Sequence, residues 1–299
     1  MTVRESSIVA ILKELETVLL ETPVPDERDS HTLNPNYTQQ LKAFRGMDQP
    51  EILSDVVSRH FLEALEAHSP GRELKVLSVG CGDGVMDNMI LTKVLASCPT
   101  ALISYTGLDI NPQSCTESEE RLQHLSVAKN VICENFETVD VSKLEKYDFI
   151  YLVHVHYYFQ QLKSVFSKIR QLLNSEGRCV VIAAPPNLHT NLIMQFWRHE
   201  GKHDIWTMND AVKVLQDIGI PYQIQEVCTK LDLSSCFKDG WSSNASRFVL
   251  DFFCGTNLTR YPDNISKLCI AYLTAATSEG PGDFVLSPIY IQVACFKAQ

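Results

Sequence analysis

Apolar residues recur at helical spacing near the start of the chain. Between residues 7 and 20, and again between 50 and 67, they return every three or four positions, which is typical of helices with one buried face. The first helix either packs on the main body or covers an active site. Residues 23–36 are rich in proline and polar side chains and predict a loop. We therefore expect an N-terminal helical cap over residues 1–70.

From residue 74 onward, short apolar runs alternate with helical patterns. The runs are residues 74–79, 101–109, 130–134, 147–153, 177–184, 222–231 and 289–296. The helical patterns lie near residues 85–95, 113–126, 161–173 and 208–218. Short apolar strands separated by helices are typical of a parallel sheet covered on both faces. We therefore predict a doubly wound, mostly parallel α/β sheet of seven strands over residues 71–299, a single α/β domain overall, with an antiparallel edge and C-terminal segments that cover a substrate.

Composition narrows the classes of partner. The chain has 299 residues, a net charge of −10 and ten cysteines. An acidic balance argues against broad nucleic-acid binding and is compatible with a small-molecule substrate. The cysteines form no C-x-x-C pair, and several lie in apolar runs, so we expect neither a disulfide framework nor a zinc site. We find neither the uninterrupted apolar core of a signal peptide nor a membrane-length apolar run, and expect a cytoplasmic monomer without membrane partners.

A glycine-rich turn, VLSVGCGDGVMD, links the first strand to a helix. It holds Gly80, Gly82 and Gly84, where the backbone needs a positive φ or must approach a ligand closely. Dinucleotide folds prefer G-x-G-x-x-G facing a pyrophosphate, whereas here the third glycine comes one residue earlier and Asp83 stands inside the loop. A carboxylate repels phosphate and suits a cofactor that carries an ammonium, such as S-adenosylmethionine. Asp83 could instead cap the helix that starts at Val85.

A second carboxylate supports this cofactor. The second strand ends at Asp109, 25 residues after Gly84. At a strand tip, a carboxylate can accept both hydroxyls of a ribose. Together the turn and Asp109 indicate an S-adenosylmethionine-dependent methyltransferase. A nucleotide-binding or oxidoreductase fold, or a relative that no longer binds the cofactor, are the alternatives.

Three segments, KVLSVGCGDG, YDFIYLVHVHYYF and KLDLSSCFKDG, resemble the histamine N-methyltransferase family. The resemblance runs from about residue 37 to the C-terminus. Many methyltransferases share the first segment, whereas the paired tyrosines and the D-x-S-x-C-F-x-D-G pattern are more specific. The resemblance implies methylation of an imidazole or related amine nitrogen by direct transfer from the sulfonium.

Matched by position, the resemblance also implies site residues. The cofactor contacts that it implies are Gly80, Asp109, Asn111, Thr138 and Val153. On the substrate side it implies Tyr157 and Tyr158, which match the family's paired tyrosines, and Trp197, which matches an aromatic residue of the pocket wall.

The chain departs from the family pattern on the substrate side. His154 stands where the family has a glutamine, Pro288 lies about where it has an asparagine, and Pro50 stands near where it has a glutamate that holds the substrate amine. Glu51, next to Pro50, could take over that role. Because the cofactor side is retained, these changes predict the same reaction on a different acceptor.

His154 follows the fourth strand, at the edge where open α/β sheets bind ligands. It could hydrogen-bond the acceptor, take its proton, bind a substrate carboxylate, or simply bond to nearby backbone. Tyr157 is expected beside it in the catalytic site. Tyr157 and Tyr158 could also face a cation through their rings or be core aromatics. His156 suggests a metal pair with His154, but no third ligand lies nearby in sequence, so no metal is predicted.

These features lead to one function and two alternatives. The chain is predicted to methylate a nitrogen of a small amine or imidazole compound, such as histamine or a histidine dipeptide like carnosine. One alternative is an O- or S-methyltransferase of natural products, which needs a stronger base. The other is a regulator that binds S-adenosylmethionine without catalysis.

Overall fold

The computed structural model describes residues 3–25, 36–67, 71–280 and 283–297. One mixed sheet runs in the order β3-β2-β1-β4-β5-β8-β6, and a short strand, β7, pairs with β8. The strands are β1 (Leu74–Val79), β2 (Ile103–Asp109), β3 (Ala128–Cys133), β4 (Tyr147–Val153), β5 (Leu173–Ala183), β6 (Tyr222–Asp232), β7 (Thr277–Gly280) and β8 (Asp283–Lys297). The doubly wound, mostly parallel fold is therefore confirmed.

The strand register brings the predicted site residues to one edge of the sheet. β1 pairs in parallel with both β2 and β4, with Val79 opposite Leu108 on one side and Leu152 on the other. β4 continues in parallel with β5, whereas β8 runs antiparallel to β5. The chain order reverses on either side of β1, and ligands of open α/β sheets bind at the carboxyl ends of strands at such a switch point.

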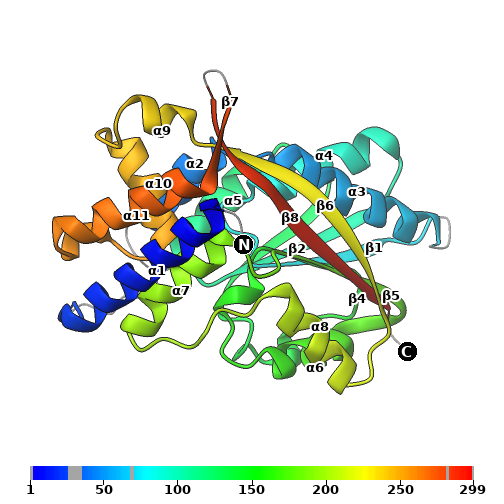
Figure 1. The fold of residues 1–299 in the computed structure, drawn as a ribbon. Helices are drawn as coiled ribbons and strands as arrows, with labels where there is room; N and C mark the ends of the chain where they lie inside the picture. Colours follow the sequence, from blue (N-terminus) through cyan, green and yellow to red (C-terminus); the bar gives the residue numbers. More distant parts are fainter. Residues whose placement is uncertain (1–2, 26–35, 68–70, 281–282, 298–299) are drawn as a thin grey trace. The chain divides into compact units, whose positions relative to one another are not determined.

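Helices cover both faces of this sheet (Figure 1). On one face lie α3 (Pro50–Glu66) and α4 (Val85–Ser97), and on the other α6 (Leu162–Leu172) and α8 (Met208–Asp217). Phe61 of α3 stacks on Phe149 of β4 with ring centroids 5.0 Å apart, and both side chains are fully buried. Three further helical segments join strands: α5 (Pro112–Leu122) and the 3-10 helices η2 (Val141–Lys143) and η3 (His156–Tyr158).

The chain divides into two compact units, each made of separate stretches of sequence. The sheet unit comprises residues 50–185, 206–227 and 291–299, and the helical unit comprises residues 1–49, 186–205 and 228–290. This division differs from the expected boundary at residue 70. α3 lies in the sheet unit because its apolar face packs on α4 and the sheet.

The helical unit has its own apolar core. It contains α1 (Val3–Glu21), α2 (Tyr37–Arg45), α7 (Leu188–His199), α9 (Ser234–Lys238), α10 (Asn244–Cys254), η4 (Leu258–Arg260) and α11 (Asp263–Ala276). α1 contacts α7 and α11, and α2 contacts α10 (Figure 1). Leu15 of α1, Phe196 of α7 and Tyr272 of α11 are fully buried in this core. The N-terminal helices are therefore stabilised by segments more than 150 residues away in sequence.

Several elements of the helical unit escaped the sequence analysis. α2, α7, α9, α10 and α11 were not predicted, and Cys236 and Phe237 of the segment KLDLSSCFKDG lie in α9. Most of the predicted loop at 23–36 lies outside the described residues, as does the side chain of Pro288.

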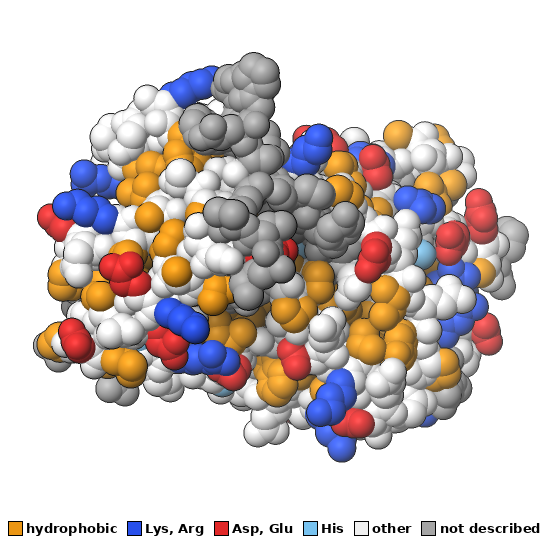
Figure 2. Space-filling model, viewed as in Figure 1, with side chains coloured by type: hydrophobic (Ala, Val, Ile, Leu, Met, Phe, Trp, Pro, Cys, Tyr) orange, Lys and Arg blue, Asp and Glu red, His pale blue; other side chains and the backbone are white. Residues whose placement is uncertain are grey.

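On the face shown in Figure 2, Lys and Arg side chains are interspersed with Asp and Glu side chains, with no continuous basic stripe among the residues described there. Among the helices of the described chain, none is both long and apolar enough to cross a membrane.

Candidate active site

The glycine turn has the backbone conformation that its sequence predicts. Gly80, Gly82 and Gly84 have φ values of 73°, 55° and 74°, a region that other residues rarely adopt. Gly80 also lies tightly against the loop that follows β4, because a Cβ at this position would be 2.3 Å from Cγ2 of Val155. The turn after β1 and the loop after β4 are thus in direct contact, with room for glycine alone at residue 80.

Asp109 is fixed against this turn at the tip of β2. Its Oδ2 accepts a hydrogen bond from Gly82 N at 2.8 Å, and its Oδ1 accepts one from Asn111 N at 2.9 Å. Burial raises the pKa of the carboxyl group, and these backbone N–H groups oppose the rise. Each carboxylate oxygen keeps a further lone pair. The oriented oxygens, beside a turn that excludes side chains, fit the diol of a ribose and hence the predicted cofactor.

Asp83 lies in the same turn, and its carboxylate faces an arginine. Arg121 of α5 donates through Nε to the carbonyl of Asp83 at 2.9 Å, and its Nη2 lies 3.7 Å from Oδ2 of Asp83. The N-cap residue of α4 is Gly84, and Val85 N reaches Oδ1 of Asp83 only at 3.4 Å. The guanidinium therefore balances the buried carboxylate, and a contact with a cofactor ammonium stays a prediction.

The remaining predicted cofactor residues, Asn111, Thr138 and Val153, lie on different elements and differ in their contacts. The Asn111 side chain caps α5 by accepting from Ser114 N at 3.1 Å. Thr138 is exposed on a turn, where its hydroxyl donates to the carbonyl of Asn135. Val153 is the last residue of β4 and pairs with Ile182 of β5. Of the three, Asn111 is linked to Asp109 directly through its backbone N–H.

His154 follows β4 in a strained conformation. Its backbone N donates to the carbonyl of Ile182 at 3.0 Å, and its φ is +53°. Non-glycine residues in this region are uncommon and concentrate at functional sites. The Nδ1 atom of His154 lies 2.9 Å from Oη of Tyr157, and the same Oη accepts from Ala184 N at 2.8 Å. The tips of β4 and β5 are thus joined through Tyr157, and the predicted pair of His154 and Tyr157 is brought together.

His156 is buried inside the sheet unit and offers no surface to a ligand. It has no exposed surface, its ring lies 4.2 Å from that of Tyr157, and burial lowers its pKa to about 3. Among the described residues neither ring nitrogen meets hydrogen-bond geometry, although the backbone of Trp206 and Thr207 lies beside the ring. A histidine buried in this way resists protonation in the folded state.

Replacing His156 should therefore weaken the acid sensitivity of the fold. The unfolded chain binds a proton near the ordinary pKa of 6.5, whereas the folded chain binds it only near 3, so stability falls as the pH drops between these values. As the pH falls from about 6 to about 4, the free energy of unfolding should decrease less steeply in His156→Leu than in the unmodified protein. The expected difference between the two slopes is about 1.4 kcal/mol per pH unit. Urea unfolding at several pH values measures this slope. The exposed residue His124, changed to Gln, is the control, and an unchanged slope in His156→Leu would contradict the prediction.

The other predicted substrate residues, Tyr158, Glu51 and Trp197, lie on different elements. Tyr158 is half-buried, with its ring edge-on to Tyr157 at 6.3 Å. Glu51 is exposed in the first turn of α3, where its carbonyl accepts from Lys93 Nζ. Lys93 lies nine residues beyond Gly84, about 13.5 Å along α4 at ~1.5 Å per residue, so this contact joins Glu51 to the later part of α4. Trp197 belongs to the helical unit, where it is buried and its ring packs edge-on against His203.

The structure adds residues that sequence analysis missed. Ile110, beside Asp109, is 39% exposed, so it offers an apolar surface to a ligand. Asp87 in the first turn of α4 is buried and accepts from Oη of Tyr151 on β4 at 2.5 Å, and burial raises its pKa. This bond ties the helix after the glycine turn to β4. The sequence GLDINP already shows that an apolar residue, Ile110, follows Asp109. The Asp87–Tyr151 bond joins positions 64 apart in the chain, so no local sequence pattern could have predicted it.

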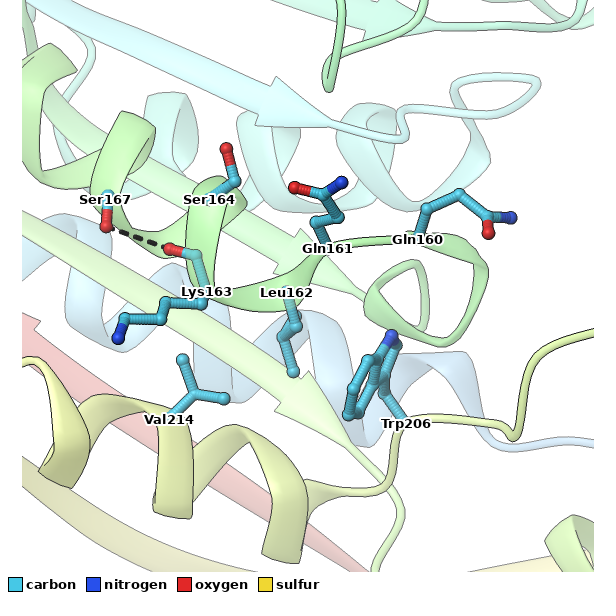
Figure 3. Close-up of a pocket in the computed structure, with 8 residues that line it drawn as sticks. All are labelled: Gln160, Gln161, Leu162, Lys163, Ser164, Ser167, Trp206 and Val214. Atoms are coloured by element: carbon cyan, nitrogen blue, oxygen red, sulfur yellow. Dashed lines mark hydrogen bonds between the residues drawn. The ribbon is translucent and has the colours of Figure 1, made fainter.

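A separate groove of about 570 Å³ lies on the outer side of the sheet unit. Leu162 at the start of α6 points between Val214 of α8 and Trp206, and polar side chains of α6 and of the two residues before it line the rest (Figure 3). The two backbone N–H groups of Gln160 and Gln161 are already bound by the carboxylate of Glu137. The groove is open, and its lining includes none of the residues of the glycine turn or the His154–Tyr157 pair.

Among the described side chains, no cluster of three potential metal ligands occurs.

Comparison with known proteins agrees with this geometry. Residues 77–179 match the family model described as a methyltransferase domain. Histamine N-methyltransferase of Bos taurus is 25% identical over 207 residues, which cover 64% of this chain and 70% of that protein. Carnosine N-methyltransferase 2 of Gallus gallus is 24% identical over 197 residues, which cover 61% of this chain and 60% of that protein.

Solved structures show the same fold. The plantazolicin methyltransferase BpumL in complex with SAH superposes with a TM-score of 0.53 at 14% identity, over 98% of this chain and 99% of that one. The YcgJ protein of Bacillus subtilis gives a TM-score of 0.52 at 15% identity, over 80% of this chain and 97% of that one.

The sheet order, the glycine turn with Asp109 and the domain match together define an S-adenosylmethionine-dependent methyltransferase. Within this class the chain is similar to the histamine N-methyltransferases of Bos taurus and Cavia porcellus, at 25% and 26% identity.

Proposed function

We propose that this methyltransferase transfers the methyl group to a nitrogen of a small imidazole or amine compound. The observation that carries the proposal is the pair formed by His154 and Tyr157 at the tips of β4 and β5, next to the turn that fits the cofactor. Burial lowers the pKa of His154 to about 4, so its ring is neutral at neutral pH. The histamine and carnosine N-methyltransferases among the relatives support the same acceptor class.

Each side of the site has a distinct task in this reaction. S-adenosylmethionine supplies an activated methyl group on a sulfonium. Asp109, held by Gly82 N and Asn111 N, would bind the ribose of this cofactor, and the glycine turn would let the cofactor approach the protein backbone closely. The His154–Tyr157 pair holds the acceptor molecule so that its nitrogen faces the methyl group. The lone pair of that nitrogen would receive the methyl group, the cofactor sulfur would be left as a neutral thioether, and a methylated imidazolium would release its ring proton to water.

The weak basicity of His154 favours nitrogen over oxygen as the acceptor atom. A free imidazole has a pKa of about 6.5 and keeps a lone pair at neutral pH, so its methylation needs no strong base. A phenol or alcohol has to lose a proton to become a good nucleophile. A histidine whose pKa lies near 4 is a poor base for that step. The O-methyltransferase alternative is therefore disfavoured by the low pKa of this ring.

A direct assay tests the proposal. Methyl transfer from isotope-labelled S-adenosylmethionine is measured on histamine, carnosine, histidine, other biogenic amines and a few phenols, with products identified by mass. We expect a labelled imidazole or amine product. Transfer to phenols alone would support the O-methyltransferase alternative. Cofactor binding in calorimetry without transfer to any compound would point to the regulator, and a lack of cofactor binding would contradict the methyltransferase assignment itself.

A further inference from the structure

The hydrogen bonds around Tyr157 determine which nitrogen of His154 carries the proton. The backbone N of Ala184 can only donate, so Oη of Tyr157 accepts in that bond. The phenol proton then needs an acceptor, and Nδ1 of His154 at 2.9 Å provides it. If Nδ1 carried a proton instead, the phenol proton would be left without that partner in a half-buried site. Nδ1 is therefore the acceptor, and the neutral ring carries its proton on Nε2.

The backbone holds the ring in this orientation. His154 is fixed on one side by its N–H bond to Ile182 and on the other by Tyr157, at a φ that few residues adopt. The residue is only half-buried, and among the described residues Nε2 has no hydrogen-bond partner. His156, two residues further on, is sealed away completely. Nε2–H of His154 is thus the polar group of this pair that remains for a ligand.

We propose that His154 presents a fixed Nε2–H donor to the acceptor and thereby selects imidazole compounds that carry a carboxylate or carbonyl oxygen. Tyr157 is the positioning residue that sets this polarity. The inference rests on the proposed methyl transfer to an imidazole nitrogen.

The chemistry of an imidazole acceptor explains this selection. The nitrogen that receives the methyl group uses its lone pair, and the other nitrogen of the neutral ring carries a proton. Two N–H groups cannot hydrogen-bond to each other. Nε2–H of His154 therefore has no partner on the imidazole ring and binds an oxygen elsewhere on the substrate. Histamine has no oxygen, whereas a histidine-containing dipeptide has a carboxylate and an amide carbonyl.

Nuclear magnetic resonance of the histidine-¹⁵N-labelled protein tests the polarity without any acceptor. We expect long-range proton–nitrogen correlations to show a single neutral tautomer of His154 with a bare Nδ1. Tyr157→Phe should mix the two tautomers. Tyr158→Phe, the neighbouring tyrosine, should leave the tautomer unchanged. A protonated Nδ1 in the unmodified protein, or the same tautomer in Tyr157→Phe, would overturn the inference whatever the enzyme methylates.

The proposed selection is tested with three acceptor compounds, each of which contains an imidazole ring. Carnosine carries a carboxylate and an amide carbonyl, its decarboxylated form keeps the carbonyl, and histamine has neither. We expect kcat/KM for one or both oxygen-bearing compounds to exceed that for histamine by about tenfold, the size of one good hydrogen bond to a charged or carbonyl oxygen. The compound at which the gain appears identifies which oxygen is bound.

The variant His154→Phe shows whether His154 causes the preference. It should remove the preference while S-adenosylmethionine affinity, measured by calorimetry, stays unchanged. Equal rates on the three acceptors, or a preference that survives in His154→Phe, would overturn the inference alone. Transfer to none of them would overturn the proposed function and the selection with it, although the tautomer experiment still reads the polarity of His154 separately.

Discussion

Gly80→Ala should reduce S-adenosylmethionine affinity at least about a hundredfold, because the added Cβ would lie 2.3 Å from Cγ2 and 2.7 Å from Cβ of Val155. Carbon atoms in contact normally lie about 3.5–4.0 Å apart, so either the turn or the loop after β4 has to move. Movement of the turn also displaces Gly82, whose N–H holds Asp109. Isothermal calorimetry measures the affinity, and thermal unfolding reports whether the variant is folded.

Gly71→Ala is a matched control for this change. Gly71 has a φ of +79°, close to the +73° of Gly80, but a Cβ there would meet nothing within 4 Å. Both variants carry the cost of a left-handed alanine, about 1–2 kcal/mol, so their difference isolates the contact with Val155. Adding Val155→Gly to Gly80→Ala should recover part of the binding. Equal affinities for the Gly80 and Gly71 variants would show that the turn does not hold the cofactor.

The sheet could be predicted from sequence because its strands are short apolar runs with clear ends. β1 and β4 match the expected residues 74–79 and 147–153, since polar or glycine residues stop each run. The helical unit was harder to predict. Its core joins stretches far apart in the chain, such as α1 with α11, and periodicity within one stretch does not show which distant face will cover it.

The sequence does contain helix-end signals in the helical unit, for example on either side of α10. α10 begins after Ser243, whose side chain accepts from Ser246 N, and ends at Gly255 with a φ of +63°. A serine before and a glycine after an apolar stretch are ordinary helix-end signals. Their neglect left residues 244–254 without an assigned element.

Sequence alone also predicts the strand ends of the candidate site better than the contacts of its side chains. Gly82 and Asp109 were expected together because parallel strands place their carboxyl ends at one edge. The pairing of Asp83 with Arg121 and the bridge from Tyr157 to Ala184 depend on side-chain directions that no sequence spacing fixes. The positive φ of His154 likewise has no sequence signal, since the residue is not glycine. The hydrogen bonds that join His154, Tyr157 and Ala184 therefore became visible only in the structure.

Asp109→Asn should lower S-adenosylmethionine affinity by about 100- to 1,000-fold, although it changes only one atom of the side chain. Both carboxylate oxygens accept backbone N–H groups, from Gly82 at 2.8 Å and from Asn111 at 2.9 Å. The amide group of asparagine would place an N–H donor against one of these donors. That arrangement leaves a buried donor unpaired, at about 1–3 kcal/mol, and also removes a charge-assisted bond to the ribose.

Asp140→Asn provides the control for this change. Asp140 accepts from the backbone N of Ser142 at 2.9 Å, which repeats the bond from Asp109 to Asn111, but its side chain is exposed and lies at the start of η2. Calorimetry should show unchanged cofactor affinity for Asp140→Asn. If Asp109→Asn binds the cofactor within about threefold of this control, well under the loss of one hydrogen bond, Asp109 does not contact the ribose and the cofactor lies elsewhere along the strand tips. The large loss would instead place the ribose at the tip of β2, between the glycine turn and the exposed face of Ile110.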